Sequence, residues 1–123
     1  MRKAMILIVH GSRVSKTADE LVDMVKKLNA RAGGGVIYFS AFMELQSPCL
    51  REAVQQAVGH GIKQIEVLPL FLLAGKHVLN DIPKIVEACR VDFPRVDISL
   101  HKHIGAADSF LDAIVNYPDL RRS

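Results

Sequence analysis

An uninterrupted apolar run, Ala4–Val9, stands near the start of the chain and ends at the polar residues His10-Gly11-Ser12. Because all its side chains are apolar, the run is typical of a strand buried on both faces of a parallel sheet. Apolar patterns predict two further strands, at Val36–Phe42 and Ile65–Leu73. A fourth strand is predicted at Val96–His101, where apolar and polar residues alternate as they do in a half-exposed edge strand.

Apolar residues at helical spacing fill the segments between these strands. The first helix is predicted from about Ser15 to the stop at Gly33-Gly34-Gly35, and the second has Ser47 as N-cap and Pro48 at its first position. Two more helices are marked by apolar residues at Ile82, Ile85, Val86 and Cys89, and at Phe110, Leu111, Ile114 and Val115. The alternation predicts an α/β fold, a single-domain flavodoxin-like parallel sheet of about four strands in the order 2-1-3-4, with helices on both faces.

The composition limits the size, the partners and the location of the protein. A chain of 123 residues, half of them hydrophobic, fits one domain over residues 1–123, with a polar tail after about residue 117 that we expect to be disordered. The net charge of +3 comes from scattered basic residues, so no nucleic-acid partner is expected. The apolar start is too short for a signal peptide or a membrane span, which predicts no membrane partner and a cytoplasmic location.

Candidate chemical groups follow the ends of the predicted strands: His10, Glu44, His77, and the pair His101 and His103. In an open parallel sheet, ligands bind outside the carboxyl ends of the strands, near the point where the strand order reverses. The order 2-1-3-4 makes the first and third strands neighbours, so His10 and His77 are expected to face each other. Imidazoles bind Co, Ni, Fe and Zn ions and accept protons near neutral pH, so the pair suits metal handling or base chemistry.

Simpler interpretations of the same residues remain open at this stage. His10 caps a turn in that view, His77 is a solvated loop residue, and Glu44 is a carboxylate at a helix start. His101 and His103 are expected at a partly exposed edge, with a part in the metal site left open. His60, between two glycines, is expected at a helix end.

Other functional classes have less support in the sequence. Gly11-Ser12 follows a strand, but the phosphate-binding patterns GxGxxG and GxxxxGK[ST] are missing, which disfavours a nucleotide- or flavin-binding module. Ser12 beside His10 does not indicate a hydrolase, because there is no GxSxG motif. Cys49 and Cys89 lack CxxC spacing and are expected to be packing residues on helices. No organic cofactor is expected.

Four short motifs, taken together and in order, resemble the small CbiX-type sirohydrochlorin chelatases, which are class II chelatases. They are Ile8-Val9-His10-Gly11-Ser12-Arg13, Phe42-Met43-Glu44 with Pro48 beyond it, Val67-Leu68-Pro69-Leu70-Phe71-Leu72, and Gly75-Lys76-His77 with Asp81-Ile82-Pro83. The resemblance covers essentially the whole chain. One departure is His103-Ile104-Gly105, where the family commonly has Pro-Leu-Gly, so a more polar cleft floor is expected.

The resemblance implies an enzyme that inserts a divalent metal, with Co²⁺ favoured over Fe²⁺ and Ni²⁺, into the anionic tetrapyrrole sirohydrochlorin during cobalamin or sirohaem biosynthesis. It implies that His10 and His77 hold the metal and that Glu44 joins them in catalysis. Substrate carboxylates would meet positive and polar groups, for which the candidates are Ser12, Arg13, Lys76 and Lys102. Small members of the family are expected to work as homodimers. A non-catalytic tetrapyrrole or metal carrier is the alternative that the sequence does not separate from the enzyme.

Overall fold

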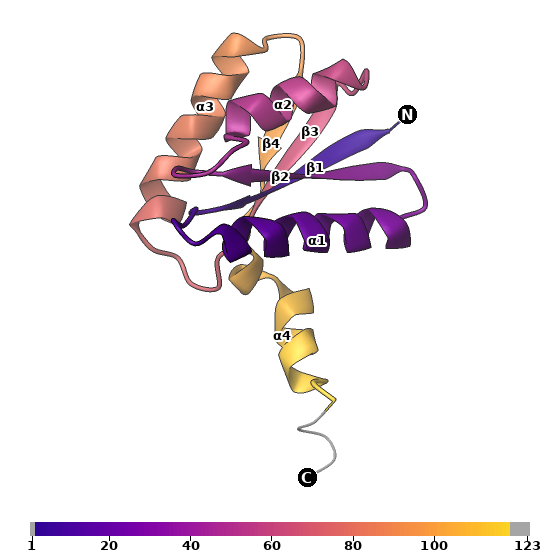
Figure 1. Ribbon diagram of the computed structural model, residues 1–123, viewed down its shortest axis with the longest axis vertical. Coiled ribbons are helices and arrows are strands. Elements are labelled where there is room, and N and C mark those ends of the chain that lie inside the picture. The colour runs from indigo at the N-terminus through magenta and orange to yellow at the C-terminus, as the bar shows by residue number, and fades with distance from the viewer. Residues whose placement is uncertain (1, 119–123) are drawn as a thin grey trace.

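The computed structural model describes residues 2–118 of the protein. A four-stranded parallel sheet forms its centre (Figure 1). The strands are β1 (Lys3–Val9), β2 (Val36–Phe42), β3 (Gln64–Pro69) and β4 (Asp97–Leu100), in the order β2-β1-β3-β4. This order confirms the predicted topology. The expected disorder of the tail concerns residues that lie almost wholly outside the described part of the chain.

Helices cover both faces of the sheet, as predicted. Helix α1 (Ser15–Arg31) lies on one face, while α2 (Leu50–Gly59) and α3 (Ile82–Asp92) lie on the other (Figure 1). A π-helical turn, η1 (His77–Asp81), precedes α3, and a 3-10 turn, η2 (Ile104–Ala106), precedes the short helix α4 (Asp108–Val115). Within residues 2–118, no helix has the length and apolar character needed to cross a membrane.

Alternation along β1 divides the core into two layers. Ala4, Ile6 and Ile8 are fully buried under α2 and α3, whereas Leu7 points to the opposite side and packs in the cluster that contains Leu21 of α1. A strand that is apolar on both faces is what the run near the start of the chain predicts. In the sheet β1 lies between β2 and β3. The strand order reverses at β1, so the loop that follows β1 lies at this reversal point.

The third strand is shorter than predicted. It ends at Pro69, and the last main-chain bond to β1 runs from the Leu70 N–H to the Ile8 carbonyl at 2.9 Å. Because β1 ends at Val9, the chain beyond Leu70 has no neighbouring strand there to pair with. Leu72 and Leu73 therefore belong to an exposed loop and not to the sheet.

The second helix begins two residues later than predicted, because Pro48 is hydrogen-bonded to the end of β2 and lies outside the helix. The Pro48 carbonyl accepts the Phe42 N–H at 2.8 Å, and the Ser47-Pro48 bond is cis. The N-cap is Cys49, whose N–H donates to the Glu52 carboxylate at 2.9 Å. Cys49 is exposed, so the prediction that it is a packing residue is wrong. Cys89 is buried, as predicted.

Candidate active site

His10 and His77 lie side by side at the carboxyl edge of the sheet. His10 directly follows β1, and His77 begins η1 in the connection after β3. Their ring centroids are 4.5 Å apart, with an angle of 42° between the ring planes. Their facing positions confirm the prediction made from strand order, and both side chains are roughly two-fifths exposed, so a ligand can reach them from solvent.

Both ring nitrogens of His10 face hydrogen-bond acceptors. Nε2 lies 2.7 Å from Oε1 of Glu44, and Nδ1 lies 3.1 Å from the Gly11 carbonyl oxygen. An imidazole can donate from both nitrogens when it carries two protons. Glu44, which follows β2, is therefore placed to exchange a proton with His10 at Nε2.

His77 is held differently, by a carboxylate on its own turn. Nδ1 of His77 lies 2.8 Å from Oδ2 of Asp81, the residue at the other end of η1. If Nδ1 carries the proton that Asp81 accepts, Nε2 keeps its lone pair for a metal ion or a proton. Asp81 was not among the residues predicted for the site. Its spacing of four residues from His77, within a helical turn, is the signal that could have indicated it.

Gly11 allows the loops that carry His10 and Glu44 to touch. Its φ is +104°, and a Cβ atom at this position would lie 1.9 Å from the Glu44 carbonyl oxygen. The Glu44 N–H also donates to the His10 carbonyl at 3.1 Å. A side chain at residue 11 would therefore both strain the backbone and push Glu44 away from His10.

Gly105 has a similar role at the β3–η1 loop. A Cβ atom there would lie 1.7 Å from the Leu72 carbonyl oxygen, and the Gly105 N–H donates to the Phe71 carbonyl at 3.1 Å. The segment after β4 thus supports the loop that leads to His77. Gly105 belongs to the segment His103-Ile104-Gly105, which is expected to make the floor of the cleft more polar. Its position is fixed by close contact with the Leu72 backbone.

Large apolar side chains are exposed on the loops that carry the three candidate residues. Those at or above half exposure are Val14, Leu45, Leu72, Leu73 and Leu79. Each lies within five residues of His10, Glu44 or His77 in the chain. We refer to these five residues as the apolar rim. Exposed apolar side chains next to a few polar side chains are typical of a surface that binds an apolar molecule.

The predicted substrate-binding residues fall into different environments. Ser12 is used locally, since its N–H donates to Gln46 Oε1 at 3.1 Å and its Oγ accepts the Val14 N–H at 3.0 Å. Arg13 and Lys76 are exposed on the two loops that carry the histidines. Lys102 lies elsewhere, at a hollow over the sheet face that Met5 and Leu68 also line.

His101 contacts a different carboxylate and not the histidine pair. Its Nε2 pairs with Oε1 of Glu66, whose other oxygen lies 2.5 Å from Lys3 Nζ. The Lys3 ammonium, and after it His101, hold the pKa of Glu66 below its usual range. Across residues 2–118, no three His, Cys, Asp or Glu side chains are grouped closely enough to form a metal cage.

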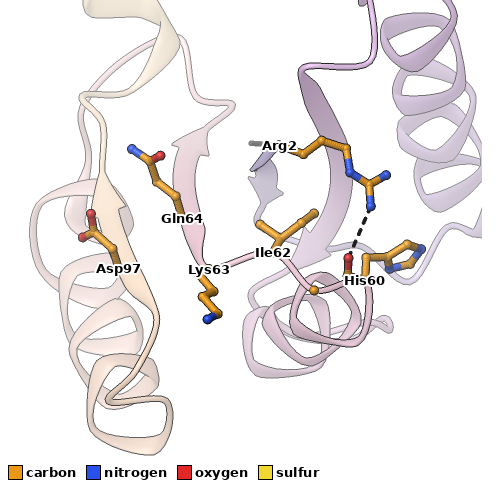
Figure 2. Close-up of a pocket in the computed structure, with 7 residues that line it drawn as sticks. Arg2, His60, Ile62, Lys63, Gln64 and Asp97 are labelled. Atoms are coloured by element: carbon orange, nitrogen blue, oxygen red, sulfur yellow. Dashed lines mark hydrogen bonds between the residues drawn. The ribbon is translucent and has the colours of Figure 1, made fainter.

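A cavity of about 530 Å³ lies at the opposite end of the sheet from the histidine pair. Arg2, Lys63 and Asp97 line it at or beside the amino ends of β1, β3 and β4. Figure 2 shows the Arg2 side chain bonded to the His60 carbonyl oxygen, while Lys63 and Asp97 point in different directions. Because these groups do not converge, the cavity offers no reaction centre. His60 caps α2, as predicted.

The fold and the site define a small α/β protein with an open parallel sheet and paired histidines at the sheet's carboxyl edge. The CbiX family profile matches residues 4–117, and the chain belongs to this family. Sirohydrochlorin ferrochelatase of Bacillus subtilis is 32% identical over 114 residues, which are 93% of this chain and 43% of that protein. Sirohydrochlorin cobaltochelatase of Methanocaldococcus jannaschii is 33% identical over 84 residues, 68% of this chain and 58% of that protein.

A solved structure shows the same architecture. The sirohydrochlorin chelatase SirB from Bacillus subtilis subspecies spizizenii, in complex with cobalt, superposes with a TM-score of 0.80 at 29% identity. The match covers 94% of this chain and 49% of that one. The chain thus spans about half the length of these three relatives.

Proposed function

We propose that this protein is a sirohydrochlorin chelatase, which exchanges two pyrrole protons of the tetrapyrrole for one divalent metal ion. The observation that carries the proposal is the pair His10 and His77, with centroids 4.5 Å apart and with Glu44 on one side and Asp81 on the other. Family membership and relatives named as sirohydrochlorin chelatases support the substrate class.

The two histidines have distinct parts in the proposed reaction. Nε2 of His77 takes the incoming ion first, because Asp81 already accepts the proton on Nδ1. Nε2 of His10 joins the ion when it gives its proton to Glu44, the carboxylate 2.7 Å away. The ion then moves into the ring as the pyrrole nitrogens lose their two protons to this carboxylate, the imidazoles or water, so that charge and protons balance.

The apolar rim and its neighbouring cations suit the shape and charge of such a substrate. A tetrapyrrole has a flat apolar ring and a periphery of carboxylates. The ring would lie against exposed leucines of the rim, and the carboxylates would meet Arg13 and Lys76 on the same loops. In this proposal Ser12 stabilises the turn after His10 through its hydrogen bonds with Gln46 and Val14. Lys102 is not part of the ring-binding surface.

Cobalt is the metal we propose, followed by ferrous iron and nickel. Imidazole nitrogen and carboxylate oxygen are compatible with all three ions, and the names of the relatives include both a ferrochelatase and a cobaltochelatase. We also propose that the protein acts as a homodimer. A second copy would enlarge the surface available to a substrate that is broad relative to a domain of this size.

The test is anaerobic mixing of the protein with sirohydrochlorin and Co²⁺, Fe²⁺ or Ni²⁺ in turn, followed by absorption spectroscopy against a reaction without protein. Acceleration is expected with at least one ion, and it should fall by about 100-fold or more in His10→Ala and His77→Ala. His60→Ala, at the far end of the sheet, is the matched control and should keep its rate. An absorption spectrum that shifts when the tetrapyrrole binds but shows no metal insertion would indicate a non-catalytic carrier and not an enzyme.

A further inference from the structure

The contact between His10 and Glu44 depends on how two loops are held, because packing does not enforce it. The two side chains are 41% and 55% exposed, and Nε2 of the imidazole lies 2.7 Å from the carboxylate. An exposed glutamate has many rotamers open to it, and water competes for its charge. A fixed separation of the main chain under the two side chains would favour their contact over these alternatives.

Main-chain pairing of the two loops continues past the strands and then gives way to a turn. The Met43 N–H donates to the Val9 carbonyl at 2.9 Å, and the Glu44 N–H donates to the His10 carbonyl at 3.1 Å. At Gly11, where φ is +104°, the chain turns out of this alignment and leads toward α1. The segment after Gly11 is connected to the Glu44 loop in another way.

The side chain of Gln46 makes that connection. Its Oε1 accepts the Ser12 N–H at 3.1 Å, and its Nε2 donates to the Val14 carbonyl at 3.3 Å. Because a main-chain N–H only donates and a carbonyl only accepts, the two partners fix the orientation of the amide. Val14 is the N-cap of α1, so Gln46 ties the loop after β2 to the start of this helix.

Between Glu44 and Gln46 the main chain makes a tight turn. Leu45 has a φ of +70°, in the left-handed region, and the Gln46 N–H donates to the Glu44 carbonyl at 2.8 Å. A hydrogen bond between residues two apart, with this φ between them, is the pattern of the strained γ-turn. Strain of this kind persists where surrounding contacts hold it. Here the Gln46 side chain holds one end of the turn, and the bond from Glu44 to the His10 carbonyl holds the other.

We propose that Gln46 is a positioning residue for the metallation reaction, which holds the Glu44 loop against the start of α1 and so sets the distance between the Glu44 carboxylate and His10 Nε2. Gln46 acts through Glu44 and does not touch the metal or the tetrapyrrole. The inference rests on the proposed function, in which Glu44 takes the proton that His10 loses. Proton transfer needs hydrogen-bond distance, and a displacement of about 1 Å can cost a reaction about 100-fold.

Gln46→Met isolates the two hydrogen bonds, because methionine keeps the length of the side chain and has neither the amide oxygen nor the amide nitrogen. The matched control is Asn29→Leu. The Asn29 amide also makes two main-chain bonds, accepting the Tyr38 N–H at 2.8 Å and donating to the Tyr38 carbonyl at 3.1 Å. These bonds join α1 to β2 away from the carboxyl end of the strand. A general loss of stability is therefore common to both variants, and a loss of positioning is not.

Metallation at saturating substrate measures the effect on the reaction. Gln46→Met should lower kcat by about tenfold or more, whereas Asn29→Leu should leave it unchanged. In a Glu44→Ala background, Gln46→Met should cause no further loss, since residues that act as one unit are not additive. Circular dichroism checks that the variants are folded. An unchanged kcat in Gln46→Met, or an equal loss with and without Glu44, would overturn the proposal.

A spectroscopic measurement tests the positioning without the reaction. Proton–nitrogen correlation spectra of the histidine rings report the hydrogen bonding of each ring nitrogen, and His10→Ala identifies the His10 signals. Gln46→Met should move the Nε2 signal of His10 toward its position in Glu44→Ala, and Asn29→Leu should not. A signal that Gln46→Met leaves in place would overturn the proposal. A moved signal in a protein that shows no metallation would contradict the proposed function and not the positioning.

Discussion

His77 and Asp81 stand at the two ends of one π-helical turn, with Nδ1 of the imidazole 2.8 Å from Oδ2 of the carboxylate. The wider π turn is uncommon and is often found at functional sites. Here it places a carboxylate against the ring nitrogen that faces away from a bound ion in the proposed reaction. Such an arrangement fixes the orientation of the ring and determines which of its nitrogens faces the ion.

Asp81→Asn should therefore lower the metallation rate by about 10- to 100-fold while the protein stays folded. The amide keeps the shape of the side chain, but it removes the negative charge that favours a proton on Nδ1. The measurement is the rate against metal concentration, since weaker metal binding would raise the concentration needed for half-maximal rate. Asp92→Asn, which breaks a surface contact with Arg51 at 3.1 Å, is the control and should leave the rate unchanged.

Gly11→Ala should disrupt both stability and the site, because its Cβ would meet the Glu44 carbonyl at 1.9 Å. The matched control is Gly34→Ala, since Gly34 also has a positive φ, +90°, but open space around it. Both changes carry a left-handed strain of about 1 kcal/mol, so the excess loss in Gly11→Ala reports the contact with Glu44. Chemical denaturation and the metallation rate are measured for both. Equal losses of stability and rate would contradict the close approach.

The fold and the paired imidazoles could be predicted because each depends on a pattern that is local in the chain. The uninterrupted run at β1 predicts a central parallel strand, and the crossovers then make β1 and β3 neighbours, which brings His10 to His77. Asp81 was missed because its role depends on the pitch of one turn. The four-residue spacing marks such a pair only within a helix, and η1 precedes the helix that the sequence pattern predicts around Ile82.

Errors in the predicted boundaries have similar causes. Ser47-Pro48 has the pattern of a helix start, but the hydrogen bond from Phe42 to the Pro48 carbonyl attaches Pro48 to β2 instead. Leu70–Leu73 has the composition of a strand, but no strand lies beside it once β1 has ended. In both cases a contact with a distant part of the chain decides where the element begins or ends.

Leu73→Ser should weaken tetrapyrrole binding without changing metal binding. The side chain is 83% exposed, so its loss costs little folding stability, and the proposed ring would cover it in the complex. Losing about 1 kcal/mol of apolar contact corresponds to about a fivefold rise in KM. Val91→Ser is the control on α3. An unchanged KM in Leu73→Ser would exclude this leucine from the binding surface.

The two cysteines should react with a thiol reagent at very different rates. Cys49 is exposed at the start of α2, while Cys89 is 2% exposed, and burial raises its pKa. The thiolate is the reactive form, so both burial and the higher pKa slow the reaction of Cys89. One fast thiol is expected in the folded protein and two after denaturation. Cys49→Ser should abolish the fast phase, and its persistence would assign that phase to Cys89.

Glu66→Gln should change how stability depends on acid. The pKa of Glu66 is lowered by Lys3 and His101, so its charged form stabilises the fold at pH values above the ordinary carboxyl range. This contribution is lost as the pH falls from the unfolded-state pKa of about 4.3 through the lower pKa of the folded protein. Wild-type protein should exceed Glu66→Gln in free energy of unfolding by about 1 kcal/mol at neutral pH, and the difference should shrink below about pH 4.

Urea titrations over this pH range measure the difference, with Glu87→Gln as the control. Glu87 pairs with Arg90 at 3.0 Å, but both side chains are well exposed, so solvent screens the pair and only a small effect is expected. Glu66, by contrast, is 14% exposed and is held from two sides, on the strand next to β1. A difference for Glu66→Gln that stays constant with pH would show that the loss comes from packing and not from the carboxylate charge.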